Sequence, residues 1–224
     1  AQQRHCGENA TPPQEHILMH DVLILAAHPD LMHSRVHAAL LAALRREPAA
    51  GPVRWLLRDL YALYPDYLID AAAEQATLQP ARLVVWLHPI HWYGMPPLMK
   101  LWCDEVLAFG WAYGPGGQAL ATKDLWLAVS TGGTDASYSP GGHNRHFIDA
   151  FWPPYEQTAA LCGMRFLPPA VLHGAHRASA DEIAAHVAMV VDRLRTWPAW
   201  PEMDELPAGL PCETPATERP ATES

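Results

Sequence analysis

The sequence predicts an open α/β fold, in which helices cover both faces of a mostly parallel sheet within a single domain. Short apolar runs alternate along the chain with stretches of helical periodicity, which is the pattern of successive βαβ units. One run, residues 83–87, is continuously apolar, as expected for a parallel strand that is buried on both faces. The 224 residues suffice for one well-buried domain, and the composition gives no reason to add a second.

Periodicity defines the elements of the first half. The first strand spans residues 22–27, and the helix after it runs over residues 34–46 with apolar residues at helical spacing. Residues 53–57 form the second strand. A short helix over residues 70–79 then leads to the third strand at residues 83–87.

Prolines and capping residues mark the elements of the second half. Pro96 and Pro97 suit the first turn of a helix that continues to Phe109, because a missing N–H costs nothing there. Ser179 and Glu182 have capping-box spacing at the start of a closing helix. We expect the fourth strand over residues 125–130 and the fifth over residues 166–173, with a helix over residues 155–162 between them. The closing helix is expected over residues 179–197.

The economical arrangement of these five strands is the order 2-1-3-4-5, with a ligand site at the carboxyl ends of the first and third strands. We expect the packed domain to span residues 21–197, after an N-terminal extension of residues 1–20. Residues 198–224 are rich in Pro and Glu, a composition that cannot bury a core, and are expected to be disordered.

Composition argues against several classes of protein. The formal net charge is -9 and no basic stripe occurs, which disfavours nucleic-acid binding. No run reaches the roughly 18 apolar residues of a membrane span, and the first residues lack the apolar core of a secretory signal. The four cysteines are scattered without a CxxC pair, which favours reduced thiols. We therefore expect a cytoplasmic protein.

The turn after the third strand carries the strongest functional signal. His91, Trp92, Tyr93 and Gly94 lie between the apolar run and the proline-opened helix. In open α/β sheets ligands bind at such strand ends, and two aromatic rings beside free backbone N–H groups suit a flat heteroaromatic ligand. A flavin is the first candidate.

The ends of the first and fourth strands carry compatible chemistry. His28, Ser34 and Arg35 bracket a helix start, where N–H groups and the helix dipole favour a phosphate, although Ser34 can also serve only as a helix cap. After the fourth strand, paired glycines let the backbone approach a planar ring closely. Tyr138 and His143 on the next loop can stabilise an anion and carry a proton, unless they are ordinary surface residues.

Together these motifs resemble the NAD(P)H:quinone oxidoreductase family of flavodoxin-like proteins over about residues 21–197. The matching pieces are Ala-His-Pro with Ser34 six residues after His28, His-Pro-x-x-Trp-Tyr-x-x-Pro-Pro-Leu-x-Lys, Gly-Trp-Ala-Tyr-Gly and Thr-Gly-Gly. Within the family the chain is most similar to the KefF/KefG type, which are ancillary subunits of glutathione-gated potassium efflux systems.

The resemblance implies a bound flavin and assigns residues to its parts. The phosphate end of the flavin would be contacted by His28, Ser34, Arg35, Val36 and His37. The isoalloxazine ring would be contacted by Ile90, His91, Trp92 and Tyr93. The polar edge of that ring would be contacted by Ser130, Thr131, Gly132 and Gly133. Tyr138 and His143 match the pair that stabilises the reduced flavin in this family. The segment 35–37 departs from the family's usual run ending in Asn, and Ser130 replaces a frequent Thr.

The implied activity is a two-electron hydride transfer from NAD(P)H through the flavin to a quinone. Short motifs do not distinguish FMN from FAD, and the subgroup favours FMN. The family forms homodimers in which Trp111 and Tyr113 would wall the quinone site, although both residues could equally be ordinary core aromatics. A second role stays open: a flavin-bound regulator of a potassium efflux antiporter, peripheral at the inner face of the membrane.

A rival hypothesis comes from residues 27–30, which also resemble the opening motif of zinc-dependent deacetylases. His33 and His37 would then share one helix face. That motif continues with acids where this chain has Leu31 and Met32, so a general base is missing nearby. No metal site is predicted.

Overall fold

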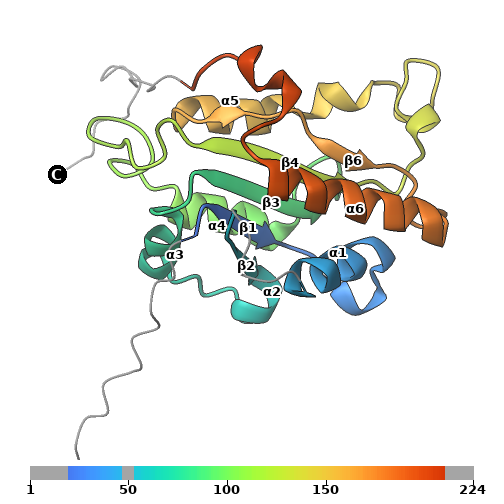
Figure 1. Ribbon diagram of the computed structural model, residues 1–224, viewed down its shortest axis with the longest axis horizontal. Coiled ribbons are helices and arrows are strands. Elements are labelled where there is room, and N and C mark those ends of the chain that lie inside the picture. The colour runs from blue at the N-terminus through green and yellow to red at the C-terminus, as the bar shows by residue number, and fades with distance from the viewer. Residues whose placement is uncertain (1–19, 47–52, 210–224) are drawn as a thin grey trace, which may run out of the picture.

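A computed structural model describes residues 20–46 and 53–209 (Figure 1). Its strands are β1 (Val22–Ala26), β2 (Trp55–Asp59), β3 (Leu83–Pro89), β4 (Asp124–Ser130), β5 (Arg165–Phe166) and β6 (Ala170–Leu172). They form one parallel sheet in the order β2-β1-β3-β4-β5, and β6 also pairs with β4. The predicted fold class and strand order are confirmed.

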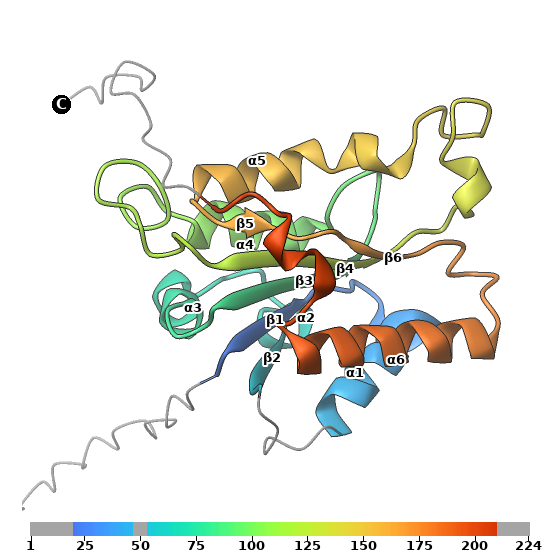
Figure 2. The same ribbon diagram turned by 45° about the horizontal axis from the view of Figure 1, so that its top comes forward.

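Helices cover both faces of this sheet. They are α1 (Arg35–Arg46), α2 (Leu60–Leu63), α3 (Ala71–Leu78), α4 (Pro97–Val106), α5 (Pro153–Leu161) and α6 (Ala180–Thr196). Figure 2 shows α1 and α6 on one side of the sheet and α5 on the other. The alternating residues of β1 divide between these layers, because Val22 and Ile24 pack with α1 and α6 while Leu23 and Leu25 pack toward α4 and α5.

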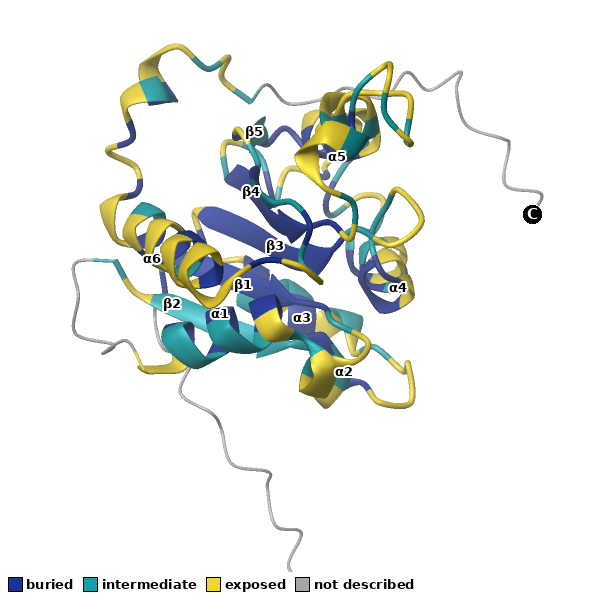
Figure 3. Cartoon of the chain, turned by 90° about the vertical axis from the view of Figure 1, so that its right-hand side faces the viewer, coloured by how far each residue is buried: buried dark blue, intermediate teal, exposed yellow. Residues whose placement is uncertain are grey.

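Every residue of β1, β3 and β4 is buried, and these strands form the dark centre of Figure 3. Strands covered on both faces must be apolar throughout, which is why the run at residues 83–87 has no polar alternation. The largest side chains in this core include Trp86, Trp102, Trp126 and Tyr155. Cys103 is partly buried and Cys162 is buried, and the two do not form a disulfide, whereas Cys6 and Cys212 lie outside the described residues.

The predicted fifth strand, residues 166–173, is instead two short strands. Pro168 and Pro169 lie between β5 and β6, and a proline has no N–H to give to a ladder of hydrogen bonds. Both pieces still pair with β4, so the position of the fifth strand in the sheet is unchanged.

Two further segments differ from the expectation. Part of the loop predicted after β2 forms α2, which Asp59 caps by accepting a hydrogen bond from the Ala62 N–H. In the segment expected to be disordered, Pro201–Asp204 forms a 3-10 helix, and Trp200 and Met203 are buried against the α6 side of the core. Besides these two side chains, the Trp200 indole N–H donates to the Arg193 carbonyl at 2.8 Å and Arg193 pairs with Glu202, so both apolar and polar contacts hold this piece on the domain. The rest of that segment, residues 210–224, and the extension over residues 1–19 lie outside the described residues.

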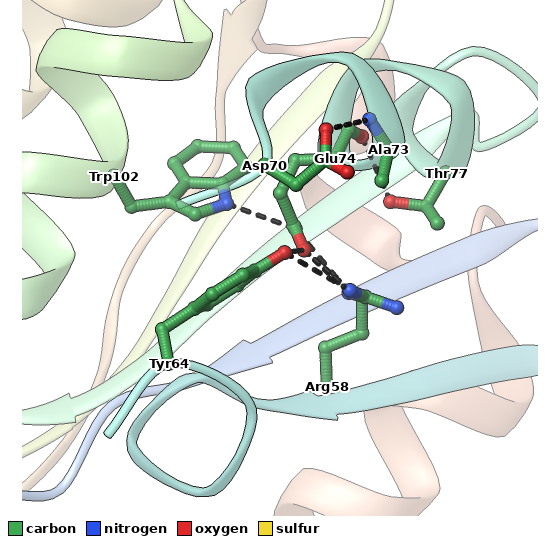
Figure 4. Close-up of polar contacts among 7 residues, drawn as sticks. All are labelled: Arg58, Tyr64, Asp70, Ala73, Glu74, Thr77 and Trp102. Atoms are coloured by element: carbon green, nitrogen blue, oxygen red, sulfur yellow. Dashed lines mark hydrogen bonds and ion pairs between the residues drawn. The ribbon is translucent and has the colours of Figure 1, made fainter. Parts of the chain in front are cut away.

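A buried carboxylate joins the elements on the α3 side of the sheet (Figure 4). Glu74 of α3 is fully buried and accepts hydrogen bonds from Arg58 of β2, from the Tyr64 hydroxyl at 2.5 Å and from the Trp102 indole of α4 at 2.9 Å. Arg58 Nε lies 3.0 Å from Glu74 Oε1. Burial, together with the bond to Glu74, raises the pKa of Tyr64 to about 12, so its hydroxyl remains a donor.

A strained turn connects β3 to α4. The His91 N–H donates to the Gly94 carbonyl at 2.9 Å and the Gly94 N–H donates back at 3.1 Å, which closes a two-residue turn. Its central residues, Trp92 and Tyr93, have φ values of 48° and 65°. Turns of this kind need two left-handed residues, and bulky side chains pay about 1–2 kcal/mol for that conformation.

We expect Arg58→Met to lower the free energy of unfolding by about 3–5 kcal/mol, because it leaves Glu74 buried without its cation. Urea denaturation measures the change. Arg45→Met is the matched control, since Arg45 pairs with Asp59 at 3.5 Å from a largely exposed position and such pairs contribute at most about 1 kcal/mol. Equal losses in the two variants would contradict the role of Glu74.

The turn gives a second prediction. Trp92→Asn is expected to raise the free energy of unfolding by about 0.5–1 kcal/mol, because Asn tolerates the left-handed region and the Trp92 side chain is 95% exposed. Trp92→Val should lower the stability, since β-branched residues avoid that region. Thermal and urea unfolding of both variants decide the point, and a less stable Asn variant would show that the turn is not strained.

Candidate functional site

The carboxyl ends of four strands surround a cavity of about 360 Å³. The segment between β1 and α1 forms one wall, the end of β3 another, and the loops after β4 and β6 complete it. Lining residues are His28, Asp30, His33, Ser34, Arg35, Val36, Pro89, Ile90, His91, Ser130, Gly132, Ala175 and His176. Polar groups from distant parts of the sequence meet here because parallel strands end at one edge of the sheet.

A second cavity, of about 310 Å³, adjoins the first at Ile90. Its walls are the strained turn and the loop after β4, through Ile90, Trp92, Tyr93, Gly133, Ser137, Tyr138, His143 and Asn144. Tyr93 stacks on Phe151 with ring centroids 5.1 Å apart, and Tyr138 meets the edge of the same ring at 5.9 Å. Phe151 therefore holds both tyrosines in place. The two cavities together are as large as pockets for organic ligands usually are.

Backbone hydrogen bonds fix the loops that form these walls. Ile90 N–H donates to the Ser130 carbonyl at 2.8 Å, and Thr131 N–H donates to the Leu172 carbonyl at 2.9 Å. The Gly174 N–H bonds the Gly133 carbonyl at 2.8 Å in the same way. The ends of β3, β4 and β6 are thus joined beyond the last ladder pairs, and the site has a preorganised frame.

The first cavity is arranged for an anion. The start of α1 directs N–H groups toward it, and Ser34 accepts a hydrogen bond from the His37 N–H at 3.1 Å, so this serine is the helix cap. The Ser34 oxygen acts as an acceptor in this capping bond, so its hydroxyl proton stays available for donation to a ligand. Arg35 supplies a permanent positive charge, whereas the Asp30 carboxylate is already bonded to His33 at 2.8 Å.

Burial keeps several histidines in and behind the wall of this cavity in the neutral form. Burial, and then the neighbouring His91, lowers the pKa of His28, and burial lowers that of His91 as well. Burial also lowers the pKa of His37 to about 3 and that of His88 to about 4. The ring centroids of His28 and His37 are 5.0 Å apart, and two neutral imidazoles can pack this closely without charge repulsion. Arg35 therefore brings a permanent positive charge to this cavity, which His28 and His91 do not at neutral pH.

The structure places most of the predicted site residues on the two cavities. His37 and Thr131 line neither. His37 is buried behind His28, and Thr131 is buried under the loop after β4. Tyr138 is shielded and His143 is exposed, yet both face the second cavity. Burial raises the pKa of Tyr138, so its phenol stays protonated at neutral pH.

The sequence reasoning missed several lining residues, above all Ala175 and His176 after β6. His176 packs on Gly132, where a Cβ would lie 3.4 Å from its ring. The rule that ligands gather at carboxyl strand ends could have found this loop, because the fifth strand was expected to end at residue 173. Asp30, His33, Pro89, Ser137 and Asn144 were also missed, and each lies within two positions of a predicted residue.

Trp111 and Tyr113 were expected at a quinone site or in the core. They pack against the apolar cluster that includes Trp102 and line neither cavity of their own chain.

His33 and His37 do not have the arrangement that the zinc hypothesis needs. His33 belongs to the 3-10 turn Leu31–His33 and pairs with Asp30, while His37 turns toward His28, so the two do not share a helix face. Over residues 20–46 and 53–209, no group of three or more potential ligands could hold a metal ion. Within the same ranges, no helix is long and apolar enough to cross a bilayer.

Comparison with known proteins identifies the family. A family model described as Flavodoxin-like fold matches residues 20–194. The glutathione-regulated potassium-efflux system ancillary protein KefF of Citrobacter koseri is 42% identical over 176 residues, which cover 79% of this chain and 96% of that protein.

Two solved structures are also similar. General stress protein 14 of Treponema denticola, in complex with FMN, is 36% identical with a TM-score of 0.73 over 78% of this chain and 97% of the other. A putative quinone reductase from Klebsiella pneumoniae is 27% identical with a TM-score of 0.67, over 80% and 85%. The chain thus belongs to the flavodoxin-like fold family, as the sheet order and the cavities at its carboxyl edge also indicate.

Proposed function

We propose that this protein is a flavin-dependent NAD(P)H:quinone oxidoreductase. The observation that carries the proposal is the pair of adjoining cavities, one with a helix start and Arg35, the other with two tyrosines and His143. An anionic tail and a planar aromatic ring are the two halves of a flavin mononucleotide. The start of α1 and Arg35 in the first cavity suit the anionic tail, and the strand ends shared between the two cavities, with the aromatic wall of the second, suit the ring.

The residues present fit such a group. Gly132 and Gly133 line the two cavities without side chains of their own, and an added Cβ would lie 3.4 Å from the His176 ring and 3.3 Å from the Tyr138 ring, so the backbone there is open to close approach by a flat ring. Ser34, Arg35 and the N–H groups of α1 would hold the phosphate. His28, Val36 and His37 would support that end, Ile90 and His91 would contact the ring with Trp92 and Tyr93, and Ser130 and Thr131 would lie at its polar edge.

A bound flavin supplies the redox chemistry, because it accepts a hydride and passes it on. The chain supplies orientation and protons. A hydride and one proton convert a quinone to a hydroquinone, so a proton must be delivered in each turnover. Tyr138 can donate it, since its phenol is protonated and shielded, and exposed His143 can exchange protons with solvent.

The similar proteins support the choice of ligands. The neighbour from Treponema denticola was solved with FMN, and the Klebsiella neighbour is described as a putative quinone reductase. We therefore propose FMN rather than FAD as the flavin, NAD(P)H as the hydride donor and a quinone as the acceptor. We also propose that the protein works in the cytoplasm.

A homodimer belongs to the same proposal. Trp92 is 95% exposed at the rim of the second cavity, and exposed aromatic surface of this kind is typical of protein interfaces. A second copy would cover this rim and bring its own Trp111 and Tyr113 toward the quinone. Analytical ultracentrifugation tests the arrangement, and a monomer at micromolar concentration would contradict it.

The similarity to KefF favours a second candidate, an ancillary subunit of a potassium efflux antiporter. Such a protein would bind flavin and dock on its partner at the inner face of the membrane. Pull-down of tagged protein from cells that encode a neighbouring antiporter tests docking. Recovery of the antiporter by a protein that does not oxidise NAD(P)H would favour this role over the enzyme.

The decisive experiment for the enzyme is an absorption spectrum of the purified protein, mass analysis of the released cofactor, and NAD(P)H oxidation with a panel of quinones. We expect a yellow protein that releases FMN and turns over with at least one quinone. Stoichiometric zinc without a flavin spectrum, or bound flavin without turnover, would contradict the proposal.

We predict that Tyr138→Phe slows hydride transfer to the quinone by about 100-fold, the low end for loss of a positioned proton donor, and that it also slows flavin reduction, because the phenol no longer stabilises the negative charge that the hydride brings to the ring. His143→Ala should slow it as well. Both variants should keep the absorbance of bound flavin, because neither residue lies at the phosphate end. Stopped-flow absorbance measures the rates, and unchanged rates in both variants would remove the assigned roles. Arg35→Ala is the contrasting variant, which should lose flavin affinity.

A further inference from the structure

His173, at the start of the loop after β6, lies beside the proposed proton donor. Its Nδ1 is 3.0 Å from the Thr131 hydroxyl, and its ring centroid is 5.4 Å from that of Tyr138. Its Nε2 faces the Asp135 carboxylate at 3.6 Å. The side chain of His173 is 18% exposed and that of Asp135 is 90% exposed, so this end of the cluster reaches solvent.

Thr131 connects the two rings. Its hydroxyl donates to the Gly133 carbonyl at 2.8 Å and lies near enough to the Tyr138 phenol to lower the pKa of that phenol against the larger effect of burial. A hydroxyl has one proton, so while it points to Gly133 its oxygen accepts from His173 Nδ1. The contact with Thr131 therefore favours the tautomer of His173 that is protonated at Nδ1, whereas the Asp135 carboxylate near Nε2 favours the other tautomer. Rotation of the hydroxyl redirects its proton from Gly133 to Tyr138.

These side chains are not needed to hold the loops together. Backbone bonds from Thr131 N–H to the Leu172 carbonyl and from Ala175 N–H to the Thr131 carbonyl, both 2.9 Å, already join the loops after β4 and β6. The Thr131 side chain is buried, so bulk water does not reach its hydroxyl directly. A fixed hydroxyl between a phenol and a partly exposed imidazole is the arrangement of a proton relay.

We propose that His173, acting through Thr131, returns a proton to Tyr138 in each turnover. The inference rests on the proposed quinone reductase, which consumes one proton for each hydride that NAD(P)H delivers. His173 is a positioning and proton-supplying residue, because it contacts Thr131 and not the reacting atoms.

The steps balance in protons and involve no change in oxidation state. Tyr138 loses its phenolic proton toward the cavity, and the Thr131 hydroxyl then gives its own proton to the phenolate. Thr131 takes a replacement from His173 Nδ1, and Nε2 takes one from solvent. A return of the imidazole to its first tautomer and of the hydroxyl to Gly133 completes the cycle.

Charges around His173 suit this task. Burial lowers its pKa and the carboxylate of Asp135 opposes that shift, so the ring is neutral at neutral pH while its protonated form is partly compensated. Among the described residues, the titratable groups in recorded contact with this ring are Asp135 of the 3-10 turn Asp135–Ser137 and Tyr138 just after it. An imidazole that gains and loses a proton with little cost is the group a relay needs.

The first test requires no flavin and no turnover. Nitrogen-15 NMR of the histidine rings in the wild-type protein should show neutral His173 protonated at Nδ1. Thr131→Val, which removes the hydroxyl and keeps the shape, should shift the tautomer balance toward Nε2. A wild-type His173 that is mainly protonated at Nε2 would overturn the relay.

The second test uses the flavin-loaded protein. His173→Gln keeps a polar side chain but cannot exchange a proton, so turnover should fall about tenfold with KM unchanged, and free imidazole should restore part of it. In the pH profile of the turnover rate, the inflection that comes from titration of the His173 ring should disappear. Asp135→Asn should move that inflection to lower pH, because loss of the carboxylate disfavours the protonated ring.

His146→Gln is the matched control, since His146 is exposed and lines neither cavity. An unchanged pH profile in His173→Gln, with normal wild-type turnover, would overturn the relay and leave the proposed function standing. A wild-type protein that binds flavin but reduces no quinone would overturn both. The two failures are therefore distinguishable.

Discussion

The carboxylate of Glu74 is the contact on which one half of the molecule depends. It lies in the core with no access to water, where an unpaired charge is costly, so its neighbours must supply donors from fixed positions. Arg58, Tyr64 and Trp102 do so from β2, from the end of α2 and from α4. This cluster joins β2, α3 and α4, and α4 is the helix that follows the turn at Trp92 and Tyr93. A buried polar cluster thus anchors the helix next to the turn that lines the second cavity.

The site itself follows from the geometry of a parallel sheet. Strands that run in one direction end at one edge, so segments far apart in sequence meet there, and hydrogen bonds beyond the ladder join the loops after β3, β4 and β6. The cavity at α1 relies on N–H groups and Arg35, because burial keeps His28, His37 and His91 neutral. The histidines shape the wall, and their charge contributes little at neutral pH.

Periodicity predicted the elements well because burial on one or two faces leaves a direct record in the sequence. The apolar run of β3, the prolines before α4 and the capping box of α6 each reflect a local constraint. The split of the fifth strand was not predicted, although Pro168 and Pro169 are its local cause. The packing of Trp200 and Met203 against the α6 side of the core was not visible, because composition alone does not reveal which apolar residues of a proline-rich segment find a partner.

By itself, the sequence determined the fold class, the strand order and the three loops with compatible chemistry, since turn residues and apolar spacing act over a few positions. Only the tertiary structure decided how side chains from different loops combine. The loop after β6 brings His176 onto Gly132 and His173 onto Thr131, and Glu74 meets Trp102 across two helices. These contacts join residues tens of positions apart, and their geometry is set by the packing of the whole sheet, which no local pattern records.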